Sequence, residues 1–107
     1  MKFSELKGAE LDYLVAKADR KKISNDGTLV MDDPNRKAYL IGREYSPSTN
    51  WSQGGPIIER EKIILNVFLV DSEWEACLPP HEYGLLGPTP LIAAMRAYVA
   101  SKFGEEV

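Results

Sequence analysis

The sequence predicts a fold of the α+β class, and three observations support this prediction. Segments with helical spacing lie near both ends of the chain, at residues 9–18 and 90–103. Short β-prone segments separated by turn signals lie between them. Their connections are too short for the crossovers of a parallel sheet. We therefore expect one domain over residues 1–107, with an antiparallel sheet of about four strands, two helices packed on one of its faces, and a short helix after a Gly-Gly-Pro loop.

The first helix is predicted from Ala9 to about Ala18, with Gly8 as a cap candidate. Apolar residues recur there on one helical face, at Leu11, Leu14, Val15 and Ala18. The basic run Arg20-Lys21-Lys22 follows the helix. Cations interact favourably with the negative end of a helix dipole, so this run is either a solvated helix end or a contact for a phosphate.

The strands are predicted from β-branched and apolar segments that lie between turns. The turn signal Asn25-Asp26-Gly27 precedes a strand at residues 28–31, and a second strand follows at 37–41. Residues 62–70 are the most hydrophobic segment and predict a central strand. Residues 73–78 alternate as a half-buried strand does.

The last helix is the clearest element. Residues 79–88, which precede it, are so rich in proline and glycine that we expect a loop there. Thr89 is an N-cap candidate, Pro90 suits the first helical position, and Gly104 is a stop signal. Arg96 lies away from the apolar stripe, which consists of Leu91, Ile92, Met95, Tyr98, Val99 and Phe103.

Composition excludes several classes of function. A net charge of −3 and a pI near 5.1 disfavour nucleic acid as the main partner, because gripping a phosphate backbone requires dense Lys and Arg. Cys77 is the only cysteine, so neither an intramolecular disulfide nor a cysteine-based zinc cluster can form. No apolar run approaches the roughly 20 residues that span a bilayer, and no leader is present. We therefore expect a cytosolic protein without a membrane partner.

The segment from Tyr45 to Arg60 has the composition of a binding loop. Tyr45 and Trp51 offer flat faces, and hydroxyl and amide side chains can donate and accept hydrogen bonds. Gly54 and Gly55 allow close approach of a ligand to the backbone. We expect a helix to begin at Pro56, where free N–H groups would form an anion site.

The same segment has a second interpretation. Ser-Pro-Ser-Thr-Asn is also ordinary turn chemistry, Trp51 can cover the core, and the glycines can permit a tight corner. Arg43 and Arg60 flank the loop and suit contact with phosphate or carboxylate. Ion pairs of these arginines with Glu44, Glu59 or Glu61 are the alternative.

No set of residues in the sequence predicts catalysis. His81 and Cys77 are four positions apart, but they lie on either side of a Leu-Pro-Pro corner and no third orienting group is marked. Glu59 and Glu61 have no metal-ligand spacing with a histidine. We predict no catalytic residue, no metal site and no cofactor.

Three blocks of the sequence together carry a resemblance to a known family. The blocks are Leu6-x-Gly8-Ala9-x-Leu11-Asp12-x-x-Val15-Ala16-x-Ala18, Tyr45-Ser46-Pro47-Ser48-Thr49-x-Trp51-x-Gln53-Gly54-Gly55-Pro56-Ile57-Ile58-Glu59-Arg60-Glu61 and Gly87-Pro88-Thr89-Pro90-Leu91-Ile92-Ala93-Ala94-Met95-Arg96. With them the chain resembles the NinX-like proteins of tailed phages and prophages. The resemblance covers most of the chain, apart from residues 20–40 and 67–83. It implies a phage gene that acts in the cytoplasm of the infected or lysogenic bacterium, and it implies no established activity.

With this resemblance, the leading hypothesis is a non-catalytic binder of a nucleotide-derived small molecule, such as a signal made by a host defence system. It would assemble as a homo-oligomer with pockets at subunit boundaries. The alternatives are an inhibitor or adaptor that binds a host or phage protein through Trp51 and Tyr83, and a hydrolase of such nucleotides. The predicted ligand-binding residues are Arg43, Tyr45, Ser48, Thr49, Asn50, Trp51, Gln53, Gly54, Gly55 and Arg60.

Overall fold

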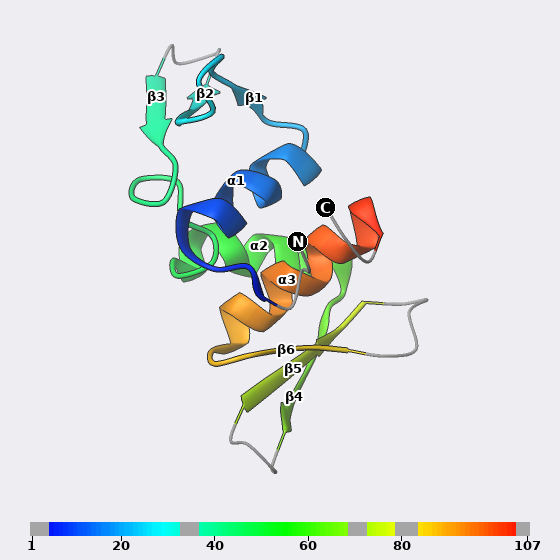
Figure 1. The fold of residues 1–107 in the computed structure, drawn as a ribbon. Helices are drawn as coiled ribbons and strands as arrows, with labels where there is room; N and C mark the ends of the chain where they lie inside the picture. Colours follow the sequence, from blue (N-terminus) through cyan, green and yellow to red (C-terminus); the bar gives the residue numbers. More distant parts are fainter. Residues whose placement is uncertain (1–4, 33–36, 69–72, 79–83, 105–107) are drawn as a thin grey trace.

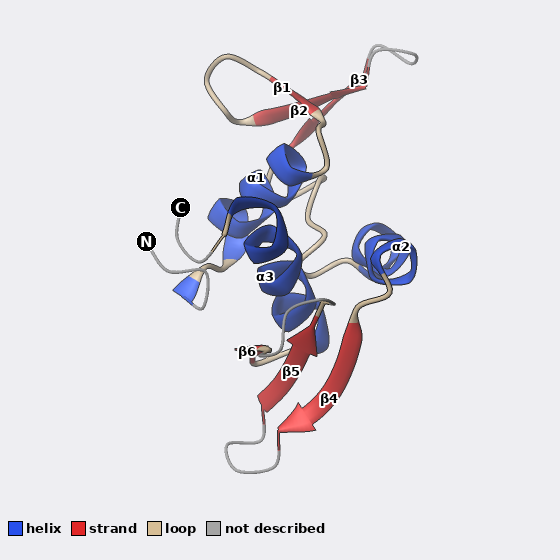
Figure 2. Cartoon of the chain, turned by 90° about the vertical axis from the view of Figure 1, so that its right-hand side faces the viewer, coloured by secondary structure: helices blue, strands red, loops and turns tan. Residues whose placement is uncertain are grey.

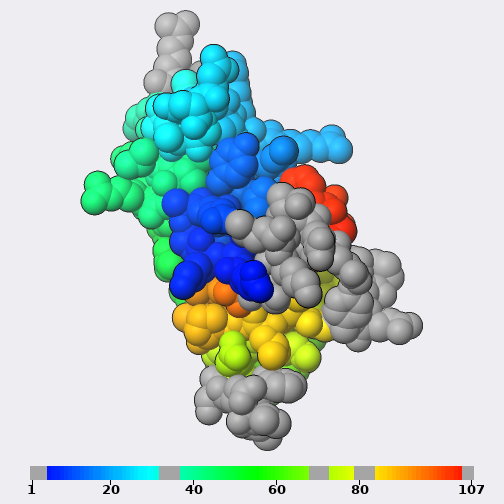
Figure 3. Space-filling model, in the orientation of Figure 1, coloured from blue at the N-terminus to red at the C-terminus, as the bar shows by residue number. Residues whose placement is uncertain are grey.

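A computed structural model of the chain describes residues 5–32, 37–68, 73–78 and 84–104. They form three helices and two three-stranded antiparallel sheets, which confirms the α+β class. The predicted arrangement, a single sheet of about four strands with two helices packed on one of its faces, is wrong. Figure 1 shows the two sheets at opposite ends of the molecule with the helices between them, and the space-filling view in Figure 3 shows the same elongated shape. The chain measures 44 × 25 × 22 Å along its principal axes.

The first sheet contains the predicted early hairpin and one additional strand. Its strands are β1 (Lys22–Ile23), β2 (Leu29–Asp32) and β3 (Lys37–Leu40). Val30 of β2 pairs with Tyr39 of β3, and Ile23 of β1 pairs with Val30 from the other side. The sequence did not predict β1, because its two residues follow directly from a basic helix end and carry no strand pattern of their own.

The second sheet contains the predicted later hairpin and a strand where a loop was expected. Its strands are β4 (Ile64–Phe68), β5 (Glu73–Cys77) and β6 (Leu85–Gly87). The loop prediction for residues 79–88 is therefore wrong at β6, and residues 79–83 lie outside the described ranges. A Cβ on Gly87 would lie 2.6 Å from the backbone nitrogen of Ala93, so glycine permits the close contact of β6 with the last helix.

The helices are α1 (Gly8–Ala18), α2 (Trp51–Glu61) and α3 (Pro90–Phe103). Helix α3 packs against α1, α2, β5 and β6, and Figure 2 shows it in the middle of the molecule. Its predicted N-cap is confirmed, because the Thr89 hydroxyl accepts a hydrogen bond of 3.1 Å from the Ile92 amide. None of the helices within the described ranges is long and apolar enough to cross a membrane.

Arg96 corrects the prediction of a single apolar stripe on α3. Its side chain is buried, with Nε donating to the carbonyl of Leu6 and Nη1 donating to the carbonyl of Leu86, both at 2.7 Å. Because burial disfavours the charged form, it lowers the pKa of Arg96. Arg96 thus connects the N-terminal segment and β6 to α3, and the helix is buried on nearly all sides.

Two separate cores explain why the strands do not form one sheet. The main core joins α1, α2 and α3 to β5, and it includes Leu11, Ile57 and Tyr98. A smaller core lies under the first sheet and consists of Ala16, Val30, Ile41 and Tyr45. The helices lie between the two sheets, so the two hairpins cannot reach each other to pair (Figure 2).

Candidate functional site

A cleft of about 610 Å³ opens where the end of α1, the first sheet and α2 meet. Its volume lies in the range usual for ligand pockets, which makes it a candidate small-molecule site. It is lined by Asp19, Arg20, Lys21, Lys22, Val30, Met31, Tyr39, Tyr45, Gln53, Pro56, Ile57 and Arg60.

Positive charge is concentrated in this cleft. Four of its five charged lining residues are cationic, and Asp19 is the fifth. The chain as a whole carries −3, so the cleft has the opposite sign to the protein. A concave surface lined by one sign of charge focuses the electrostatic potential and attracts oppositely charged solutes. The cleft therefore favours an anion.

The end of α1 positions the basic run at the cleft. The amide of Lys21 donates to the carbonyl of Ala16 and that of Arg20 to the carbonyl of Lys17, the hydrogen bonds of a Schellman motif. Arg20 occupies the left-handed position of this motif, at φ 57°, where glycine is the usual residue. The turn reverses the chain into β1 and places three consecutive cationic residues, 20–22, on the wall of the cleft.

Gln53 fixes the opposite wall. Its Oε1 accepts a hydrogen bond of 2.6 Å from the Ser46 amide, and its Nε2 donates at 2.7 Å to the carbonyl of Glu44. These two bonds hold the segment before α2 against the helix itself. Because Tyr45 lies between the two bonded residues, its ring is held in place beside the cleft.

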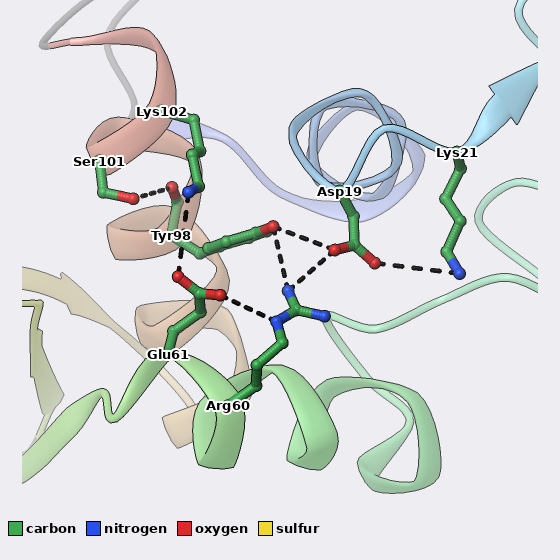
Figure 4. Close-up of polar contacts among 7 residues, drawn as sticks. All are labelled: Asp19, Lys21, Arg60, Glu61, Tyr98, Ser101 and Lys102. Carbon is green, nitrogen blue, oxygen red and sulfur yellow. Dashed lines mark hydrogen bonds and ion pairs between the residues drawn. The ribbon is translucent and has the colours of Figure 1, made fainter.

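Arg60 connects the cleft to α1 and α3, as Figure 4 shows. Its Nη2 donates at 2.8 Å to Asp19 Oδ1 and at 3.1 Å to the hydroxyl of Tyr98, while Nε donates at 2.8 Å to Glu61. The Tyr98 hydroxyl donates in turn to Asp19 Oδ1 at 3.1 Å. The alternative predicted for Arg60, an ion pair with Glu61, is thus present.

These contacts shift the pKa values of the cluster. The hydrogen bond from Arg60 to Glu61 is the main cause that raises the pKa of Arg60, which remains cationic. Burial, followed by the charge of Asp19, raises the pKa of Tyr98 to about 12. The Tyr98 hydroxyl therefore stays protonated and able to donate at physiological pH.

The structure brings three of the predicted ligand-binding residues into the cleft, namely Tyr45, Gln53 and Arg60. Two others are buried in packing: Ser48 donates its amide to Asp12 at 2.9 Å, and Gly54 lies against Pro47. The rest, Arg43, Thr49, Asn50, Trp51 and Gly55, are not among the lining residues.

The predicted helix start at Pro56 is wrong. Helix α2 begins at Trp51, with Asn50 as its N-cap, and Pro56 lies inside it. The Asn50 side chain accepts a hydrogen bond of 2.9 Å from the Ser52 amide, and the Gly54 amide donates to the carbonyl of Asn50. The anion site expected from free N–H groups at Gly54 and Gly55 is therefore not formed there.

The family assignment comes from the sequence profile of a family described as "Bacteriophage P22, NinX", which matches residues 2–102. The chain belongs to this NinX family. The match spans every residue of the cleft and confirms the resemblance seen in the three sequence blocks. No functionally curated protein matches this NinX chain.

Asp19 and Tyr39 of the NinX-family chain are lining residues with polar side chains that were not predicted. Tyr39 is part of a strand pattern, and Asp19 ends a helix, so neither has a local signal of binding. The basic run was noted as a phosphate contact, and its position on the cleft is consistent with that alternative. His81 lies outside the described residues. Within the described ranges, no group of three or more His, Cys, Asp and Glu residues could hold a metal ion.

Proposed function

We propose that this NinX-family protein is a non-catalytic binder of a nucleotide-derived small molecule, held in the cleft at the end of α1. The observation that supports this most directly is the coincidence of cationic side chains with the partly exposed Tyr39 in one concave site. Cations neutralise a phosphate, and aromatic rings stack on a base. The two chemistries together match a nucleotide better than a simple carboxylate metabolite.

The phage family supports a role inside an infected bacterium. A binder without turnover acts by lowering the free concentration of its ligand. We propose that the ligand is a nucleotide signal made by a host defence system, and that the protein sequesters it in the bacterial cytoplasm.

Titration calorimetry against a panel of mononucleotides, dinucleotides and cyclic nucleotides tests this function. We expect at least one member to bind the wild-type protein, and Tyr39→Ala to weaken that binding by about tenfold, since stacking of a base on an aromatic ring contributes roughly 1–3 kcal/mol. Trp51→Ala is the matched control, because it removes an exposed aromatic ring from the same helix that contributes Arg60, outside the cleft.

The proposal fails if no nucleotide in the panel gives heat and if mass spectrometry finds no small molecule released from the denatured, purified protein. It also fails if Trp51→Ala weakens binding and Tyr39→Ala does not, since the ligand would then bind elsewhere.

One observation favours a second function, an inhibitor or adaptor that binds a protein. The Trp51 side chain at the start of α2 is 55% exposed, and tryptophan is enriched among residues that dominate binding energy at interfaces. The other predicted anchor, Tyr83, lies outside the described residues. A pull-down from infected cells tests this function: a stoichiometric host or phage protein that Trp51→Ala releases and Tyr39→Ala retains supports the adaptor. Light scattering of the purified protein tests the proposed homo-oligomer separately.

A further inference from the structure

The carboxylate of Asp19 lies among a guanidinium from α2, a hydroxyl from α3 and an ammonium from the turn after α1 (Figure 4). Its Oδ1 accepts from Arg60 of α2 and from Tyr98 of α3, and its Oδ2 lies 3.9 Å from the ammonium of Lys21. A guanidinium, a hydroxyl and an ammonium are also the donors that commonly bind a phosphate oxygen. The protein therefore contains a formed anion site that one of its own side chains occupies.

Asp19 is poorly placed to be a permanent occupant. It is the C-cap residue of α1, and a carboxylate at the C-terminal end of a helix is disfavoured by the helix dipole. Its negative charge is offset there by Arg60 and Lys21. An anion that enters the cleft from the solvent would bind the same donors. Unlike the carboxylate of Asp19, it would not be held at the end of a helix.

Arg60 is oriented to accept such an exchange. Its Nε is held by Glu61, which sets the plane of the guanidinium, while Nη2 points to Asp19. The Arg60 side chain is 49% exposed, and Arg60, Asp19 and Lys21 all line the cleft. Both cationic donors, Arg60 and Lys21, are therefore accessible from the cleft.

We propose that the phosphate group of the ligand binds at the position of the Asp19 carboxylate, to Arg60, Tyr98 and Lys21, and that Asp19 is a built-in competitor which the ligand displaces. This inference rests on the proposed function and identifies the phosphate subsite within the cleft. It assigns Tyr98, which is not among the lining residues, a hydrogen bond to the bound phosphate. It also predicts that removal of a carboxylate improves the affinity for an anion.

Inorganic phosphate and adenosine 5′-monophosphate are the probes of the test, titrated by calorimetry into the full-length protein. We expect Asp19→Ala to bind inorganic phosphate about tenfold or more tightly than the wild type, because phosphate then no longer has to displace a charged acceptor from these donors. Arg60→Gln added to Asp19→Ala should abolish this gain. Lys21→Gln should reduce it, and Lys62→Gln, which removes a cation that does not line the cleft, should not.

The opposite view is that Asp19 only links the three helices. In that case Asp19→Ala loses stability and its phosphate affinity is equal to or below that of the wild type, which overturns the inference. Circular dichroism checks that each variant is folded. If Asp19→Ala does not fold, Asp19→Asn replaces it, because the amide keeps the shape of the side chain and removes the competing charge.

The two proposals fail separately. If no nucleotide binds to any variant but Asp19→Ala binds inorganic phosphate, the subsite stands and the nucleotide function is wrong. If a nucleotide binds the wild type and neither Asp19→Ala nor Arg60→Gln changes its affinity, the function stands and the subsite is overturned.

Discussion

The buried carboxylate of Asp12 accepts a hydrogen bond of 2.9 Å from the backbone amide of Ser48. Asp12 is in the middle of α1 and only 1% exposed, whereas Ser48 lies in the segment that leads into α2. Burial raises the pKa of Asp12 above its ordinary value of 3.8, and the bonds from Ser48 partly offset this effect. The pair fixes the segment before α2 against α1 and so positions one wall of the cleft.

The first prediction concerns the pH dependence of this pair. Between pH 3.8 and the raised pKa of Asp12, the native protein keeps a proton on this carboxyl group that the unfolded chain releases. The free energy of unfolding of the wild type therefore falls as the pH rises through this range. Asp12→Asn cannot ionise. We expect it to be more stable than the wild type at pH 7, with a difference that shrinks as the pH falls toward 3.8. Urea denaturation of both proteins between pH 3.8 and 7 measures this difference in stability.

Asp12→Ala is the control for that measurement. It leaves the Ser48 amide buried without an acceptor, so we expect a loss of about 1–3 kcal/mol. The asparagine variant avoids this loss because its carbonyl can accept the hydrogen bond from the Ser48 amide. A difference between Asp12→Asn and the wild type that does not change with pH would contradict the prediction.

The second prediction compares the two adjacent glycines of α2. A Cβ on Gly54 would lie 2.4 Å from the carbonyl oxygen of Pro47 and 2.6 Å from Leu91, so Gly54→Ala should lower stability by about 1–3 kcal/mol through overpacking. A Cβ on Gly55 would meet only the Trp51 ring, at 3.8 Å. Gly55→Ala should therefore raise stability by about 0.5–1 kcal/mol, the gain in helix propensity. Thermal unfolding of both variants shows whether the signs are opposite.

The third prediction uses the two residues other than glycine that have positive φ, within the described ranges. Arg20 and Lys62 both adopt φ 57° at helix ends. Glycine at either position should relieve this backbone strain. The net gain in stability should be roughly 0.5–1 kcal/mol, because glycine also has a larger conformational entropy in the unfolded chain. Only Arg20 lines the cleft. Nucleotide titration should show weaker binding for Arg20→Gly and unchanged binding for Lys62→Gly; equal affinities for both variants would argue against a role of the basic run.

The fourth prediction concerns two tyrosines near Asp19. The Tyr45 hydroxyl is buried and has no hydrogen-bond partner in the described part of the chain, so Tyr45→Phe should raise stability by about 1 kcal/mol. The Tyr98 hydroxyl accepts a hydrogen bond from Arg60 and donates one to Asp19, so Tyr98→Phe should lower stability by about 1–2 kcal/mol. Denaturant midpoints of the two variants measure the contrast, and a loss of stability in Tyr45→Phe would show that its hydroxyl has a partner after all.

Local patterns predicted most of the regular elements. The helices near the two ends of the chain and the pairing within each hairpin are confirmed, because they depend on spacing of apolar residues and on turn signals between near neighbours. Helix α2 was placed wrongly because Gly54, Gly55 and Pro56 are helix breakers by propensity. In the folded chain Gly54 is required by the close approach to Pro47, and the packing of Ile57 in the core outweighs the low propensity.

For the candidate site, too, the sequence predicted the chemistry of single residues but not their arrangement in space. The chemistry of Tyr45, Gln53 and Arg60 and the membership of a phage family could be inferred from residue types and motifs along the chain. The cleft itself could not, since it depends on Arg60 meeting Asp19 across 41 positions and on two cores that keep the hairpins in separate sheets. Sequence spacing determines which residues share a helix face or a strand face. Contacts between distant segments depend on how those faces pack, and only the folded chain brings the basic run, the tyrosines and Arg60 into one site.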